Sequence, residues 1–169
     1  MNSSLPKIYR KIRTHKTEYP IRPCVAFYSD PTSNVAKYLV DLFRCTSQFQ
    51  PGHTIKNSFE LASRLRDIKF PTSTKLLSFD VTSMFTGIPV ARAITFMEDF
   101  LKEKNIQQET IQEFKDLLHH CVDKDLCVFG GTVYRFPDGL PMRGPLSILV
   151  ADVFLNRLET EIVETNSRV

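Results

Sequence analysis

The chain has 169 residues, of which 42% are hydrophobic and 24% are charged, and its net charge is +3. This composition is ordinary for a globular protein and excludes low-complexity and fibrous classes. The length is sufficient to bury a substantial core in one domain or two small lobes. The amino terminus is basic rather than apolar, and no run approaches the length of a membrane span, so we expect no signal peptide and no membrane partner.

The basic residues are concentrated at the amino terminus. Residues 1–22 contain six Lys or Arg against one Glu, a local charge of +5, which leaves about −2 for the remainder. A basic arm on a nearly neutral body is suited to contact with phosphates, which dominate non-specific affinity for nucleic acids. The alternative is a solvated, disordered tail. The apolar and aromatic residues within the arm (Ile8, Tyr9 and Ile12) indicate that part of it packs or stacks.

The first half of the chain is predicted to be mostly helical. Three prolines make residues 17–33 extended and turn-rich, with a strand at 24–28. A helix is expected at about 34–44, with an inward face of Val35, Tyr38, Leu39, Leu42 and Phe43. Asn57, with Glu60 three residues later, resembles a capping box and predicts a second helix at about 58–68. The inward face of that helix would carry Phe59, Ala62, Leu65 and Ile68.

A short apolar run at 75–80 ends on a lone carboxylate, Asp80, and predicts a buried strand. A carboxylate at the carboxyl end of a core strand lies where open α/β sheets usually bind ligands. The alternative is a helix-capping or solvated Asp in a loop between a strand and a helix.

The second half alternates helices with a hairpin. Pro89 fits the first turn of a helix at about 89–103, and a further helix is expected at about 109–122. Core positions in these helices are Val90, Ile94, Met97, Leu101, Ile111, Phe114, Leu117, Leu118 and Cys121. Gly130-Gly131 predicts a tight turn between strands at 126–129 and 132–136, and Pro145 opens a long apolar helix to about 164. The fold class predicted by this order is α+β.

The four cysteines (Cys24, Cys45, Cys121 and Cys127) have no metal-ligand spacing and are expected to be reduced, mostly buried thiols of an intracellular protein.

The segment Asp80-Val-Thr-Ser-Met-Phe85-Thr-Gly-Ile-Pro89 resembles the first catalytic motif of reverse transcriptases, most closely that of Penelope-like retroelements. Other blocks resemble the same family in the same order, so the similarity covers nearly the whole chain. They are Pro6-Lys-Ile-Tyr-Arg-Lys11, Ile21-Arg-Pro23, Val35-Ala-Lys-Tyr-Leu39, Ile55-Lys-Asn-Ser58, Phe129-Gly-Gly-Thr-Val-Tyr134 and Asp138-Gly-Leu-Pro-Met-Arg-Gly-Pro-Leu-Ser147. The resemblance implies the fingers of a right-hand polymerase at 1–72 and a partial palm at 73–169, truncated before the aromatic-x-Asp-Asp hairpin and the thumb.

The resemblance also implies a catalytic chemistry. Two Mg²⁺ ions would activate the primer hydroxyl and neutralise the leaving pyrophosphate in nucleotidyl transfer. Asp80 would be the catalytic, metal-binding carboxylate, and the backbone carbonyl of Val81 would add a further oxygen. The implied partners are an RNA template, a DNA primer and deoxynucleoside triphosphates, and the implied location is nuclear.

The remaining implied site residues bind the nucleotide. Phe85 would lie under the sugar and exclude a ribose 2′-hydroxyl, and the alternative is a core phenylalanine. Arg22 would grip the triphosphate, because a guanidinium fork suits phosphate oxygens. Gly139 and Met142 would form part of the floor beneath the templating base and the nucleotide, with the glycine permitting close backbone approach.

Two departures from the family pattern bear on activity. Arg143 stands where the family usually has glycine, so a long charged side chain is expected to obstruct the approach of the backbone to substrate. The alternative is that this side chain contacts phosphate. The chain also contains no Asp-Asp pair. One carboxylate cannot hold two metals, so the 169 residues alone are expected to be inactive as a polymerase. The leading hypothesis is therefore a fragment of an RNA-directed DNA polymerase of a retroelement, and the alternative is a non-catalytic nucleic-acid-binding remnant.

Overall fold

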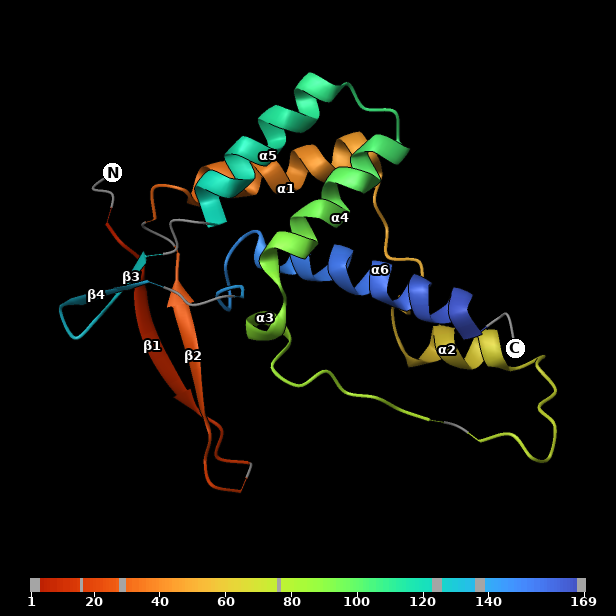
Figure 1. Ribbon diagram of the computed structural model, residues 1–169. Helices are drawn as coiled ribbons and strands as arrows, with labels where there is room; N and C mark the ends of the chain where they lie inside the picture. Colours follow the sequence, from red (N-terminus) through yellow and green to blue (C-terminus); the bar gives the residue numbers. More distant parts are fainter. Residues whose placement is uncertain are drawn as a thin grey trace.

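The computed structural model describes residues 4–15, 17–27, 30–75, 77–122, 126–135 and 139–166. Within these ranges a four-stranded sheet lies at one side of the molecule and a group of packed helices at the other (Figure 1). The predicted α+β class is therefore confirmed. Among the described helices, none is long and apolar enough to cross a membrane.

The sheet joins the amino-terminal segment to a hairpin from the second half of the chain. Strands β1 (Lys7–Ile12) and β2 (Ile21–Ala26) form an antiparallel pair. Strand β3 (Leu126–Phe129) lies parallel to β1, and β4 (Thr132–Arg135) completes the order β2-β1-β3-β4. The basic arm is thus structured along β1 rather than disordered.

The predicted strands are confirmed in part. The hairpin of β3 and β4 turns at Gly130 and Gly131, whose φ angles of 58° and 84° explain the choice of glycine. Strand β2 begins at Ile21, earlier than the predicted strand at 24–28, whose last residue lies outside the described ranges. Strand β1 was not predicted, although Ile8 and Ile12 recur with the even spacing that is typical of one strand face.

Apart from α3 (Met84–Gly87), which was not predicted, the described helices lie close to their predicted positions. The other helices are α1 (Ser33–Ser47), α2 (Ser58–Leu65), α4 (Val90–Glu103), α5 (Gln108–Val122) and α6 (Ser147–Asn166). Pro89 is the N-cap of α4 rather than a residue of its first turn. Helix α6 likewise begins two residues after Pro145.

The hydrophobic core lies between α1, α4, α5 and α6. The side chains buried most deeply include Leu39, Phe43, Met97, Ile111, Leu118 and Leu149. Phe43 is central, because its ring centroid lies 5.9 Å from that of Phe49 and 5.6 Å from that of Phe114. The predicted apolar faces of α1, α4 and α5 are confirmed, except that Tyr38 and Leu117 are exposed.

Helix α2 has the predicted start but not the predicted burial. The Asn57 side chain accepts a hydrogen bond from the Glu60 backbone N–H at 3.0 Å, as in a capping box. The Glu60 carboxylate accepts in turn from the Lys56 backbone N–H. No residue of α2 is buried, and Phe59 is 83% exposed. The predicted inward face of this helix is therefore wrong, because no other element covers it within the described chain.

The strand predicted at 75–80 is not formed in the described part of that segment. Residues 77–80 are an exposed, irregular connection, with Leu77 78% and Phe79 90% exposed. The long trace that leads from α2 to α3 runs outside the packed helices (Figure 1). An apolar run forms a buried strand only where a neighbouring strand pairs with it, and the sheet ends at β2 and β4.

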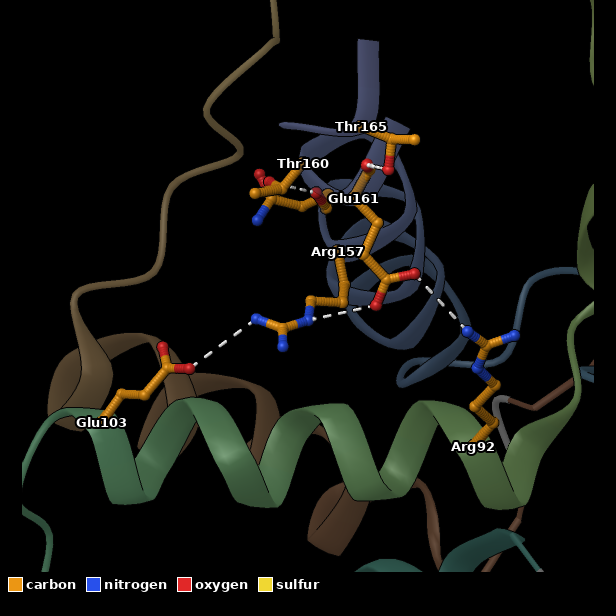
Figure 2. Close-up of polar contacts among 7 residues, drawn as sticks. Arg92, Glu103, Arg157, Thr160, Glu161 and Thr165 are labelled. Atoms are coloured by element: carbon orange, nitrogen blue, oxygen red, sulfur yellow. Dashed lines mark hydrogen bonds and ion pairs between the residues drawn. The ribbon is translucent and has the colours of Figure 1, made fainter. Parts of the chain in front are cut away.

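Ion pairs on the surface join α4 to α6, which cross and pack against each other. Figure 2 shows Arg157 of α6 between Glu103 of α4, at 3.7 Å, and Glu161 of its own helix, at 3.4 Å. Arg92 of α4 lies 3.6 Å from the second Glu161 oxygen. These groups are about half exposed, so each pair is worth roughly 1 kcal/mol or less. The packing of α4 on α6 depends mainly on the buried apolar side chains.

The four cysteines form no disulfide with one another, and the prediction that most of them are buried is confirmed. Cys24, Cys121 and Cys127 are buried, and Cys45 is exposed.

Candidate functional site

A cavity of about 600 Å³ lies between the β1–β2 hairpin and the segment that leads into α3. We call it the Asp80 cavity. It is lined by Arg13, His15, Ile21, Arg22, Pro23, Asp80, Val81, Thr82, Ser83, Met84, Phe85, Thr86 and Met142. Five of the six site residues predicted from the sequence are among these, although they come from three distant segments.

Asp80 reaches the cavity from the exposed chain before α3, not from the end of a strand. Its side chain is exposed and has no hydrogen-bond or ion-pair partner within the described residues. Val81 follows with 54% exposure, and Ser83 turns the chain into α3 with a left-handed φ of 53°. The Asp80 carboxylate and the Val81 carbonyl are therefore placed on a local turn rather than on a sheet edge.

Phe85 belongs both to the hydrophobic core and to the wall of the cavity. It lies in α3, is half-buried and packs against the hydrophobic core. It also lines the Asp80 cavity. The ring is thus fixed by core packing while it forms part of the cavity wall.

Arg22 lies in β2 on the opposite wall. It pairs across the hairpin with Lys11 and is exposed. Residues directly opposite in an antiparallel pair share one face of the sheet, so two positive charges lie side by side there. The adjoining hairpin end adds Arg13 and His15 to the cavity, which makes this wall basic.

The segment 139–146 joins the two walls. The Leu140 backbone N–H donates to the Phe85 carbonyl at 2.7 Å, and the Val25 N–H donates to the Met142 carbonyl at 3.3 Å. Gly139 has φ 106°, and a Cβ atom there would lie 2.6 Å from the Thr86 carbonyl oxygen. Gly139 does not line the cavity. It permits the close approach that places Met142 in it.

Arg143 does not obstruct the Asp80 cavity. Its φ of 76° is in the left-handed region that favours glycine, which accounts for the glycine expected at this position. Its side chain lines a different cavity, where Nη1 donates to the Tyr9 hydroxyl at 2.7 Å. The expected obstruction is therefore wrong, because the backbone turns the guanidinium to the other side of the segment.

The described residues do not fit a two-metal centre. Asp80 is the single carboxylate among the residues that line the cavity, and nowhere in the described ranges do three His, Cys, Asp or Glu side chains gather as metal ligands. Asp152 does not line the cavity but is half-buried in α6. Burial raises the pKa of Asp152, and the charge of Arg44 opposes that rise. One carboxylate suits a single Mg²⁺ that arrives with phosphate ligands of its own.

Sequence reasoning missed the contribution of the hairpin end. Arg13, His15 and Ile21 line the cavity because β1 pairs with β2, which brings both ends of the turn to the segment before α3. The alternation of Ile8 and Ile12 with polar residues was a signal for β1. Nothing in the local sequence indicated that this hairpin would face Asp80.

Comparisons with protein-family models, with curated proteins and with solved structures found no match to this chain.

Proposed function

We propose that the Asp80 cavity binds the incoming deoxynucleoside triphosphate of an RNA-directed DNA polymerase of a retroelement. The chain would supply the fingers and part of the palm of that enzyme. One observation carries the proposal. The reverse-transcriptase resemblance assigns Arg22, Asp80, Phe85 and Met142 to nucleotide binding and catalysis. They come from three segments that are far apart in the sequence, and they line one cavity.

The roles follow from the position of each side chain. Arg22, on the basic wall, would bind the triphosphate through charge-assisted hydrogen bonds. Asp80 and the Val81 carbonyl would hold a Mg²⁺ ion, which when bound neutralises phosphate charge. Phe85, held by the core, would pack against the sugar and exclude a 2′-hydroxyl. These residues bind and orient a nucleotide, and two-metal transfer requires carboxylates beyond Asp80.

A second candidate function is a non-catalytic nucleic-acid-binding module. The single carboxylate in the Asp80 cavity favours it, together with the basic β1–β2 hairpin. The two candidates differ in whether the cavity discriminates between deoxynucleotides and ribonucleotides. A binding module has no need of sugar selectivity.

The proposal is tested by titrating the chain with dATP and with ATP in the presence of Mg²⁺ and measuring both dissociation constants by calorimetry. These ligands differ only in the 2′-hydroxyl. We expect dATP to bind more tightly, Arg22→Gln to weaken dATP binding by roughly tenfold or more, and Phe85→Val to bring the two constants together. Arg10→Gln is the matched control, because Arg10 lies on β1 but does not line the cavity.

If Arg22→Gln and Arg10→Gln weaken dATP binding equally, the effect comes from the overall charge of the chain. That result would contradict the assigned triphosphate site. Equal affinity of the wild-type chain for dATP and ATP would contradict the role of Phe85 and favour the binding module.

A further inference from the structure

A second cavity, of about 630 Å³, lies on the other side of the Met142–Arg143 segment. We call it the Arg143 cavity. The two cavities lie on either side of a pair of consecutive residues, since Met142 lines the Asp80 cavity and Arg143 lines the Arg143 cavity. Three cationic side chains line it, Lys7 from β1, Lys37 from α1 and Arg143, and no carboxylate is among its described lining residues. An uncompensated cluster of three positive charges in a hollow favours an anionic ligand.

The Arg143 guanidinium is held in place before any ligand binds. Nη1 donates to the Tyr9 hydroxyl at 2.7 Å, and the guanidinium carbon lies 5.9 Å from the centre of the Tyr9 ring. A guanidinium has five N–H donors, so the bond to Tyr9 leaves others for a ligand. The backbone of Arg143 has a left-handed φ of 76°, a conformation that is unfavourable for a residue other than glycine. The surrounding contacts therefore fix an unfavourable conformation that aims this cation into the cavity.

Ser33 provides an unpartnered polar group at the same place. It lines the cavity and is only 7% exposed, yet its hydroxyl has no hydrogen-bond partner within the described residues. No buried side-chain oxygen of the described residues lacks a hydrogen-bond partner, so the Ser33 hydroxyl opens onto the cavity, where a ligand or water can bond to it. Ser33 is the first residue of α1, whose amino-terminal end attracts anions, and Lys37 lies one turn later on the same helix face. The carboxylate of Asp30 accepts a hydrogen bond from Thr32 and does not line the cavity.

The positive charges continue from this cavity to the other. Lys7, Tyr9 and Lys11 alternate onto one face of β1, and Arg22 lies directly opposite Lys11 on β2. Arg22 lines the Asp80 cavity, whereas Lys7 and Tyr9 line the Arg143 cavity. A continuous cationic face that joins two hollows suits an extended polyanion better than a single small phosphate.

We propose that the Arg143 cavity binds a phosphodiester group of a nucleic-acid strand, and that the strand continues along β1 to the Asp80 cavity. Lys37, Arg143 and the Ser33 hydroxyl would donate to the phosphate oxygens. Arg143 would thereby contribute a phosphate contact that glycine, the residue expected at this position, cannot make. The inference rests on the proposed function in that a polymerase holds a strand beside its nucleotide site, but it concerns a separate cavity.

The test is the binding of a fluorescent twelve-nucleotide single strand to the whole chain, measured by anisotropy over a series of salt concentrations. Lys37→Gln removes an exposed charge, and Arg143→Asn removes the guanidinium while retaining a residue that tolerates the left-handed backbone. Each variant should weaken binding and reduce the slope of log affinity against log salt by about 0.7, the value for one contact with a single strand. Lys69→Gln is the matched control, because Lys69 is exposed and lines neither cavity. It should leave the slope of the wild-type chain unchanged.

Two results would overturn the inference. The first is that the wild-type chain does not bind the strand, or that the Lys37→Gln and Arg143→Asn variants have the same slope of log affinity against log salt as Lys69→Gln. The second is competition by inorganic phosphate as effective as that of unlabelled strand at equal phosphate concentration, which would indicate a site for free phosphate. The dATP titration reports separately on the Asp80 cavity. Normal strand binding without dATP binding would therefore contradict the proposed function alone.

Discussion

At the scale of single residues, Gly139 shows how a position outside the Asp80 cavity determines its shape. The Gly139 backbone passes so close to Thr86 that a Cβ atom would meet the carbonyl carbon, oxygen and Cα of that residue at 2.6–2.8 Å. The neighbouring bond from Leu140 to the Phe85 carbonyl depends on this approach. A backbone group cannot swing aside as a flexible side chain can, so the contact has little room to adjust.

Gly139→Ala should therefore lower the free energy of unfolding by at least about 1–3 kcal/mol, since the left-handed φ alone costs that much. It should also weaken dATP binding, because Phe85 and Met142 would be displaced. Chemical denaturation and calorimetry measure the two effects. Gly87→Ala is the control: Gly87 lies in the adjacent α3, has open space around its Cα and should change stability by less than about 0.5 kcal/mol. Equal stability of the two variants would contradict the close approach.

At the scale of elements, the helices are joined by a buried apolar core and by ion pairs at its edge. Glu98 of α4 is the best placed of these ions. Its two oxygens lie 2.8 Å from Lys102 Nζ on the same helix and 2.6 Å from Lys115 Nζ on α5. The Glu98 side chain is only 16% exposed. Hydrogen bonds from Lys102 and Lys115 lower the pKa of Glu98 below its usual value of 4.5.

Glu98→Gln should destabilise the protein by roughly 0.5–1 kcal/mol at neutral pH. A carboxylate whose pKa is lowered by folding stabilises the protein above its unfolded pKa, near 4.5. That stabilisation is lost as pH falls through the lower folded pKa. The difference in unfolding free energy between wild type and variant should therefore shrink as pH falls below about 4.5 and disappear once pH is below the folded pKa of Glu98. Glu103→Gln removes an ion that is 58% exposed and should have a smaller effect. If the difference in unfolding free energy between wild type and Glu98→Gln stays unchanged at low pH, the ion pairs of Glu98 are not its cause.

At the scale of the whole molecule, the chain divides into a packed part and an exposed connection. The helices α1, α4, α5 and α6 share one core, whereas α2 and the chain that follows it contribute no buried side chain up to residue 83 among those described. Regions with few buried contacts open at low free energy. The Asp80 carboxylate lies at the end of this exposed connection, so its position depends on the local turn into α3.

Limited chymotrypsin digestion should therefore cut first after Leu77 or Phe79, both of which are exposed. Cleavage after Phe43 or Phe114 should follow much later, because these rings are buried and require the core to open. Mass spectrometry of the first fragments measures the order. Initial cleavage inside α1 or α5 would contradict the division into a packed part and an exposed connection.

The sequence by itself determined the helices α1, α4 and α5 and the hairpin of β3 and β4. Amphipathic spacing and the Gly130-Gly131 turn are local properties, so they can be recognised without knowledge of neighbouring elements. The failures are all non-local. The apolar face of α2 has no partner in the described chain, the apolar run before Asp80 has no neighbouring strand, and β1 forms because β2 and β3 pair with it.

The candidate site also has features that the sequence indicated and features that only the tertiary structure decided. The sequence indicated Arg22, Asp80, Phe85 and Met142 as individual residues, through a family resemblance. Only the tertiary structure decided that these residues line one cavity, that Gly139 acts through backbone contact, and that Arg143 faces a second cavity. The reason is that a strand or a side chain finds its partners through contacts between distant segments, whereas local sequence restricts only the backbone angles of each segment.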